Sequence, residues 1–239
     1  MRPRYGAVLF DLDGTLIGLD VEEFIPAYFE SISRFVADDD SKRDEFIRRL
    51  TEATHHMIAD TDPTVTNREV FERHFFDGVG KTRRAEEEAA FDEFYRREFP
   101  RLGSLCRPIP GVGGVLDGLA EAGVDRVLAT NPLFPRMAIE SRLQWGGLDP
   151  EGFALLTSYE NSCFCKPNPG YYREILRKMG LEGGDVLMVG NDPLEDMIAA
   201  EAGVDTFLVD HYVVPRDGDV PNPTYRGSIT DVPDVVMDC

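Results

Sequence analysis

Two aspartates that follow the first apolar segment of the chain are the first residues whose spacing suggests chemistry. Asp11 and Asp13 stand directly after the apolar run 6–10, which has the length and composition of a buried strand. Side chains two residues apart in extended backbone point to the same side, so both carboxylates can act on one reacting group. One carboxylate can attack an electrophile while its neighbour transfers protons. Gly14 permits the chain to turn sharply beside them.

Polar side chains also follow the other predicted strands. Short apolar runs predict strands over 126–129, 153–156, 186–189 and 206–209. The carboxyl ends of parallel strands meet at one edge of a sheet, and ligands of open parallel sheets bind there. The residues that this rule adds to the two aspartates are Thr130, Asn131, Lys166, Asp192 and Asp196.

This set of residues combines carboxylates with groups that bind anions. Clustered carboxylates repel one another, and Mg²⁺, which takes one or two carboxylates, waters and a phosphate oxygen, removes that repulsion. A hydroxyl, an amide and an ammonium group are donors suited to an anion. The combination predicts phosphoryl transfer, in which Asp11 attacks phosphorus and Asp13 moves protons. Lys166 would then balance the charge on the phosphoryl oxygens.

The elements that position these residues fall into two groups. Residues 108–239 alternate between strand and helix signals, as in a parallel sheet with helices on both faces, whereas residues 20–100 carry almost only helical periodicity. The first strand cannot form a sheet alone, so it must join the later ones. We therefore predict an α/β fold with a three-layer Rossmann-like core and a parallel sheet. Its predicted parts are a discontinuous core, residues 1–17 and 108–239, and an inserted α-helical cap, residues 18–107.

Two expectations concern the C-terminal part of the chain. Asp192-Pro193 is predicted to start a helix that Gly203 stops, because Pro is favoured at the first helical position. The last thirty residues are rich in Pro, Asp and Gly, so we predict a tail that runs over the surface.

Four motifs, in this order along the chain, resemble those of the haloacid dehalogenase (HAD) superfamily, whose members are mostly phosphatases. The motifs are Asp11-Leu12-Asp13-Gly14-Thr15-Leu16, Leu128-Ala129-Thr130-Asn131, Lys166-Pro167-Asn168-Pro169 and Val189-Gly190-Asn191-Asp192-Pro193-Leu194-Glu195-Asp196. The helical segment between the first and second motifs is similar to the all-helical (C1) cap of this superfamily. The resemblance therefore extends to the phosphoglycolate phosphatase and β-phosphoglucomutase-like members.

The resemblance implies a role for each catalytic and phosphate-binding candidate. Asp11 would be the nucleophile and a Mg²⁺ ligand, and Asp13 would be the acid/base with its backbone carbonyl on the metal. Thr130 and the backbone of Asn131 would hold the phosphate, and Lys166 would steady the phosphoryl group and Asp11.

The fourth motif supplies the remaining implied roles. Asp192 would ligate Mg²⁺, and Asp196 would support the waters of the metal or Lys166. Asn191 departs from the pattern, because many relatives have Gly there and some have a metal-binding Glu. Its amide oxygen can serve the metal or a metal-bound water, and its role is left open.

Composition excludes several classes of partner. The chain has 239 residues with 44 acidic and 25 basic ones, a formal net charge of −19, which argues against nucleic acid and anionic membranes. No apolar run approaches the ~20 residues that span a bilayer. With no signal-like segment at the start and four cysteines expected to be reduced, the chain is predicted to be cytoplasmic. Only four basic residues are lysines, which makes Lys166 a minority choice.

The leading hypothesis is a Mg²⁺-dependent phosphomonoester hydrolase that acts on a small phosphorylated metabolite through an aspartyl-phosphate. A sugar phosphomutase of the same fold is one alternative, since it shares the nucleophile and the cap class. A catalytically silent metal- or phosphate-binding regulatory protein is the other, because fold alone does not prove activity. Oligomeric state has no signature in the sequence.

Overall fold

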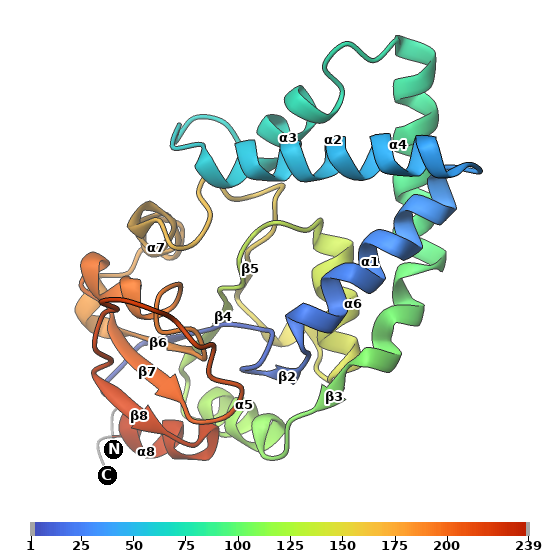
Figure 1. Ribbon diagram of the computed structural model, residues 1–239. Coiled ribbons are helices and arrows are strands. Elements are labelled where there is room, and N and C mark those ends of the chain that lie inside the picture. The colour runs from blue at the N-terminus through green and yellow to red at the C-terminus, as the bar shows by residue number, and fades with distance from the viewer. Residues whose placement is uncertain (1–2, 238–239) are drawn as a thin grey trace.

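The computed structural model describes residues 3–237, and its centre is a six-stranded parallel sheet (Figure 1). The strand order is β5-β4-β1-β6-β7-β8, so the N-terminal strand lies inside the sheet between two strands from the second half of the chain. The strands are β1 (Ala7–Phe10), β4 (Asp125–Leu128), β5 (Leu155–Leu156), β6 (Val186–Gly190), β7 (Asp205–Val209) and β8 (Tyr225–Gly227). This order brings the ends of β1, β4 and β6 together.

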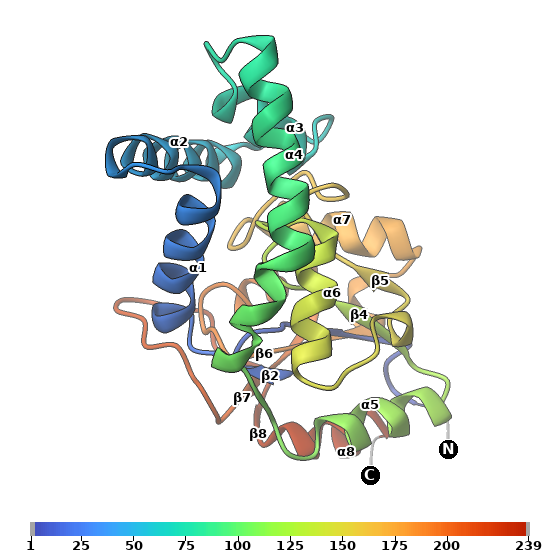
Figure 2. The same cartoon turned by 90° about the vertical axis from the view of Figure 1, so that its right-hand side faces the viewer.

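Alternate residues of each strand pack on opposite faces of the sheet. In β1, Val8 and Phe10 belong to one apolar cluster, and Ala7 and Leu9 to another. Helices α5 (Val112–Glu121), α6 (Arg136–Trp145) and α8 (Val232–Met237) cover the first face, and α7 (Pro169–Met179) with the 3₁₀ helix η4 (Met197–Ala202) covers the second. Figure 2 shows α5 and α8 lying side by side. The predicted three-layer Rossmann-like fold is confirmed.

Four helices form the segment between β2 and β3. They are α1 (Val21–Val36), α2 (Asp40–Ala59), α3 (Asn67–Phe75) and α4 (Lys81–Arg97), and the 3₁₀ helix η1 (Phe99–Leu105) follows them. Thr66 and Glu69 form the capping box that opens α3. The strands β2 (Ile17–Gly18) and β3 (Arg107–Pro108) pair antiparallel, which brings the start and the end of this insert together. The division at residues 17/18 and 107/108 stays a prediction.

Aromatic side chains join the insert to the core. Phe24 of α1 lies 6.1 Å from Phe134 and 6.2 Å from Trp145, measured between ring centroids. Phe99 of η1 stacks on Trp145 at 5.1 Å. Burying side chains of this kind is worth roughly 1.5–3 kcal/mol each. This shared cluster fixes α1 and α6 beside the carboxyl ends of β1 and β4.

The prediction that the last thirty residues run over the surface was wrong for residues 225–237. Residues 211–224 before them form neither helix nor strand, and residues 238–239 lie outside the described part. The segment 225–237 contains β8, the 3₁₀ helix η5 (Ile229–Asp231) and α8, and Ile229, Val232 and Val236 are buried. A capping box of Ser228 and Asp231 opens this part. The composition rich in Pro and Gly concealed it, although Ser-x-x-Asp before an apolar pair is a start signal for a helix.

The prediction of a helix from Asp192-Pro193 to Gly203 was also wrong, both in the type of helix and in the residue at which it starts. The chain forms a turn over 193–196, and only then does the 3₁₀ helix η4 begin. The Asp192 carboxylate accepts from the backbone N–H groups of Leu194 (2.8 Å) and Glu195 (3.1 Å). These are the bonds of a helix N-cap, and the backbone N–H of Asp196 donates to the Asp192 carbonyl at 3.0 Å, so residues 193–196 form one closed turn before η4.

A buried ion pair inside the insert gives a stability prediction. Arg49 of α2 donates to Glu87 of α4 (3.1 Å) and to the carbonyl of Phe75 (3.1 Å), and both charged side chains are 9% exposed. Arg49→Met leaves Glu87 with Arg83, whose Nε lies 2.9 Å from Glu87 Oε1. It also removes the donor to the Phe75 carbonyl, so we expect a loss of about 1–3 kcal/mol in the free energy of unfolding. Urea unfolding followed by circular dichroism measures it.

The adjacent residue is a matched control for this prediction. Arg48 pairs with Glu52 in the same helix, and its side chain is 60% exposed. Arg48→Met should change the free energy of unfolding by less than ~1 kcal/mol. Equal losses in the two variants would contradict a structural role for the buried pair.

Candidate active site

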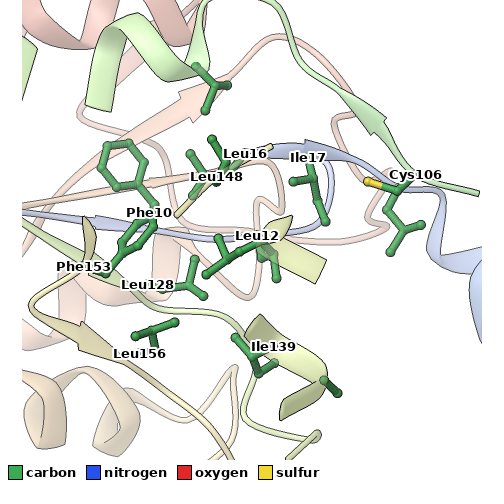
Figure 3. Packing of buried hydrophobic residues seen from close by; sticks show 14 of the residues in the cluster. Phe10, Leu12, Leu16, Ile17, Cys106, Leu128, Ile139, Leu148, Phe153 and Leu156 are labelled. Carbon is green, nitrogen blue, oxygen red and sulfur yellow. The ribbon is translucent and has the colours of Figure 1, made fainter. Parts of the chain in front are cut away.

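The first two candidates project from the end of β1 in the centre of the sheet. The backbone N–H of Asp11 donates to the carbonyl of Val189 at 2.9 Å, which ties this end of β1 to β6. Leu12 is fully buried in the apolar cluster beside Leu128 (Figure 3). Asp11 and Asp13, which flank Leu12, line a cavity of about 610 Å³. The predicted common orientation of these two carboxylates toward one space matches the structure.

Glycine at position 14 is required by both its conformation and its neighbour. Gly14 has φ of +77°, and a Cβ there would collide with the side-chain amide of Asn191. That amide accepts from the Thr15 hydroxyl (3.2 Å) and donates to the carbonyl of Tyr212 (2.7 Å). Asn191 therefore connects the turn after β1 to the segment after β7. The sequence analysis left the role of Asn191 open and did not predict this contact.

Lys166 lies between two carboxylates. Its ammonium group donates to Asp11 Oδ1 at 2.8 Å and to Asp196 Oδ1 at 2.6 Å, and the residue is 2% exposed. Burial alone would lower the pKa of Lys166, but the two carboxylates prevail and hold it well above its usual range. Burial raises the pKa of Asp196 to about 7, against the opposing effect of Lys166. Lys166 thus fixes the position of Asp11.

Asp196 reaches Lys166 because the preceding strand ends in glycine. A Cβ at Gly190 would overlap the Asp196 carboxylate. The second oxygen of this carboxylate, Oδ2, accepts from the backbone N–H of Asp192 at 2.9 Å. Asp196 therefore orients both Lys166 and the loop that carries Asp192.

Hydrogen bonds hold Thr130 and Asn131, the two predicted phosphate-binding residues in the loop after β4. The Thr130 carbonyl accepts from the Tyr171 hydroxyl at 2.8 Å. The Asn131 side chain accepts from the backbone N–H of Lys166 (3.2 Å) and donates to Glu195 (3.1 Å). Thr130 and Asn131 both line the cavity, and the side chain of Asn131 ties three loops together.

Asp192 lines the same cavity and is held by an arginine. Arg216 Nε lies 3.0 Å from Asp192 Oδ1 and 3.1 Å from Oδ2. Burial would raise the pKa of Asp192, but the bonds from Arg216 and from the backbone N–H groups of Leu194 and Glu195 hold it below its usual value.

Among the residues of the cavity wall that the sequence analysis missed, three charged ones contact predicted site residues. Arg142 comes from α6 and pairs with Asp13, while Arg216 and Glu195 lie around Asp192. Arg216 follows β7, so the strand-end rule would have found it if we had applied it to that strand. Arg142 lies inside a helix, where that rule gives no signal.

Comparison with known proteins supplies the family. The model for haloacid dehalogenase-like hydrolases matches residues 5–203, which include every predicted site residue. The chain belongs to this family of hydrolases. A phosphoglycolate phosphatase of Rhodospirillum rubrum is 26% identical over 86% of this chain and 79% of that protein. A phosphoglycolate phosphatase of Agrobacterium fabrum is 27% identical over 99% of this chain and 90% of its own length.

Solved structures agree with the HAD-like fold. The crystal structure of a HAD phosphatase from Thermococcus onnurineus has a TM-score of 0.58 at 19% identity, covering 98% of this chain and 97% of that one. Identity at this level supports the fold alone. The prediction that the chain is a hydrolase of this superfamily is confirmed.

The oxygen donors of this HAD-like hydrolase fit Mg²⁺ bound together with a substrate. Within residues 3–237, no three His, Cys, Asp or Glu side chains are grouped as an all-protein metal site. Mg²⁺ needs only one or two carboxylates, because waters and phosphate oxygens complete its shell. Asp11 and Asp192 line the same cavity, so their carboxylate oxygens supply the one or two protein donors that Mg²⁺ needs. The donor set therefore fits, provided that Arg216 yields its place on Asp192.

The cysteines near Lys166 give a reactivity prediction. Cys165 is 1% exposed, and burial raises the pKa of its thiol to about 12. At pH 8 the thiolate, which is the reactive form, is scarce, so we expect no labelling of Cys165 by iodoacetamide in the native protein. Mass spectrometry after labelling, before and after unfolding in urea, measures it. Rapid native labelling would show that this segment opens.

The membrane and thiol expectations have partial outcomes. In the described part of the chain, every helix is too short or too polar to cross a lipid bilayer. Cys106, Cys163 and Cys165 are free thiols, and Cys239 lies outside the described residues.

Proposed function

We propose that this HAD-like hydrolase is a Mg²⁺-dependent phosphomonoesterase that acts on a small phosphorylated metabolite through an aspartyl-phosphate on Asp11. The observation that carries the proposal is the contact of Lys166 with Asp11, beside Asp13 and next to Thr130 and Asn131 in one cavity. Both curated relatives are named for the hydrolysis of phosphoglycolate, a small phosphate monoester. This substrate supports the small-metabolite class for the present chain.

The first step transfers the phosphoryl group to the enzyme. A carboxylate oxygen of Asp11 attacks phosphorus, and the bond from phosphorus to the ester oxygen breaks. Asp13 gives a proton to the departing oxygen, so the alcohol leaves neutral. The positive charge of Lys166, which lies next to Asp11, stabilises the charge on the phosphoryl oxygens. Thr130 and the Asn131 backbone are further donors.

The second step returns the enzyme to its starting form. Asp13, now a carboxylate, takes a proton from water as the water oxygen attacks the phosphorus of the aspartyl-phosphate. The bond from phosphorus to Asp11 breaks, which releases inorganic phosphate and restores the carboxylate. Mg²⁺, held by Asp11, Asp13 and Asp192, would neutralise phosphate charge and bring the phosphorus near Asp11.

The residues argue against carbon–halogen chemistry, from which the family takes its name. Dehalogenation of this type requires neither a metal nor a proton donor for the leaving group. This chain places Asp13 beside Asp11 in the cavity and adds Asp192 as a further oxygen donor. A phosphate monoester uses all three carboxylates.

Removal of Mg²⁺ tests the proposal. Purified protein should hydrolyse p-nitrophenyl phosphate with Mg²⁺, and excess EDTA should lower the rate at least ~100-fold, since a Lewis acid contributes several kcal/mol. Restoring Mg²⁺ is the control and should restore the rate. Absence of turnover with Mg²⁺ would contradict the proposal; binding of phosphate without turnover would favour a regulatory protein. Turnover of a hexose phosphate only after a bisphosphate is added would favour the mutase.

We also place the protein in a reducing compartment, the cytoplasm. The support is the state of Cys106, Cys163 and Cys165, which are free thiols in the structure. Loss of activity on reduction with dithiothreitol would contradict this placement.

A further inference from the structure

The residue that pairs with the acid/base Asp13 is an arginine with almost no access to water. Arg142 of α6 is 2% exposed, and its guanidinium group forms an ion pair with Asp13, whose side chain is 18% exposed. Its Nε is buried and has no hydrogen-bond partner. Burial lowers the pKa of Arg142 to about 10, which leaves it charged near neutral pH. A buried cation with an unused donor is available to a second anion.

The surroundings of Arg142 form a wall of the cavity. Its guanidinium carbon lies 5.7 Å from the ring centroid of Phe24 and 5.3 Å from that of Phe134. All three residues line the cavity. Aromatic faces stabilise a guanidinium group and exclude water around it, so an anion that binds there gains more than it would in solvent.

The other cations near the cavity are paired elsewhere. Lys166 contacts Asp11 and Asp196, and Arg216 contacts Asp192. Asp20 and Glu22 add negative charge at the start of α1, where they also line the cavity. Arg142 is therefore the cation that an anionic group close to Asp13 would meet.

The role of Asp13 places such a group beside Arg142. If Asp13 protonates the leaving oxygen, then the atoms attached to that oxygen lie next to the partner of Asp13. A carboxylate on the leaving alcohol, close to the ester oxygen, would bind the guanidinium group of Arg142 in place of Asp13. Asp13 would then be free for proton transfer.

We propose that Arg142 is a specificity-determining residue that binds a carboxylate of the substrate, so that the preferred substrates are phosphate esters of short hydroxy acids. This inference rests on the proposed phosphatase function and assigns the leaving-group side of the site. Arg is suited to it because its planar guanidinium group binds a carboxylate through two parallel hydrogen bonds.

The test compares two nearly isosteric phosphate esters. They are 2-phosphoglycolate and phosphoglycolamide, in which a neutral carboxamide replaces the carboxylate. Wild type should favour the carboxylate ester in kcat/KM by at least ~10-fold, and Arg142→Gln should lower this preference roughly 10- to 100-fold, the range for losing a charge-assisted pair. Arg142→Lys, which keeps the charge but not the fork, should fall between them. Arg126→Gln removes another partly buried arginine, outside the cavity, and should leave the preference unchanged.

Two results separate failure of this inference from failure of the proposed function. If wild type hydrolyses both esters equally, or Arg142→Gln slows both by the same factor, Arg142 only positions Asp13 and the inference is overturned. If no phosphate ester is hydrolysed, the phosphatase proposal fails first. Calorimetric binding of 2-phosphoglycolate and its amide to Asp11→Asn protein, with and without Arg142→Gln, then decides the carboxylate contact without turnover. Thermal unfolding checks that each variant is folded, and Arg142→Lys carries the test if Arg142→Gln is not.

Discussion

Replacing Asp11 by Asn is expected to lower kcat for p-nitrophenyl phosphate at least ~10⁴-fold, as loss of a nucleophile does in other enzymes with covalent intermediates. The amide has the shape of the carboxylate but does not attack phosphorus. It also gives Lys166 a neutral partner in place of a charged one, at a position where the two atoms are 2.8 Å apart. Steady-state kinetics with saturating Mg²⁺ measures the loss.

The control for Asp11→Asn is the same chemical change at an exposed aspartate. Asp117 lies on the solvent side of α5, and Asp117→Asn should keep wild-type kinetics. Trapping with radiolabelled substrate adds a second readout, because acid-quenched wild type should carry label that Asp11→Asn lacks. Retention of more than a tenth of the wild-type rate in Asp11→Asn would show that another group attacks phosphorus.

Sequence alone predicts the centre of this site because parallel sheets place the ends of their strands together. Asp11, Thr130 and Asp192 are far apart in the chain, yet each follows a strand of one sheet whose order puts β1 between β4 and β6. Short apolar runs locate such strands, and the rule of strand ends then lists the polar residues. The sheet itself requires no knowledge of side-chain contacts.

The residues that were missed depend on contacts that no local pattern specifies. Arg142 projects from the last turn of α6, and its relation to Asp13 depends on how α6 packs on the sheet. Asn191 was singled out with its role left open, and its bonds to Thr15 and Tyr212 depend on the course of the segment after β7. Asp192 caps a first turn, as Asp192-Pro193 indicates, but the 3₁₀ form of the residues that follow it has no local signal in the sequence.

The second large effect is expected at Lys166, where catalysis and stability coincide. Lys166→Met removes the charge between Asp11 and Asp196, so kcat should fall about 10²–10³-fold, as for loss of a preorganised donor to a transition state. The variant also leaves the Asp196 carboxylate, 1% exposed, without its counter-ion. Breaking a buried pair on one side costs about 3–5 kcal/mol of the free energy of unfolding. Lys42→Met is the control, since the side chains of Lys42 and its partner Asp39 are 68% and 49% exposed and their pair should contribute little to the free energy of unfolding.

A double-mutant cycle separates the cost of an unpaired charge from the loss of packing around Lys166. If the stranded carboxylate causes the instability, Asp196→Asn added to Lys166→Met should recover a large part of the lost free energy, because the second change removes the buried charge. If lost packing causes it, the two losses should add. Activity should not follow stability in these variants. The double variant should regain stability and remain inactive. We thus expect that Lys166 serves to place a positive charge next to Asp11. The Asp196 carboxylate offsets the free-energy cost of burying that charge.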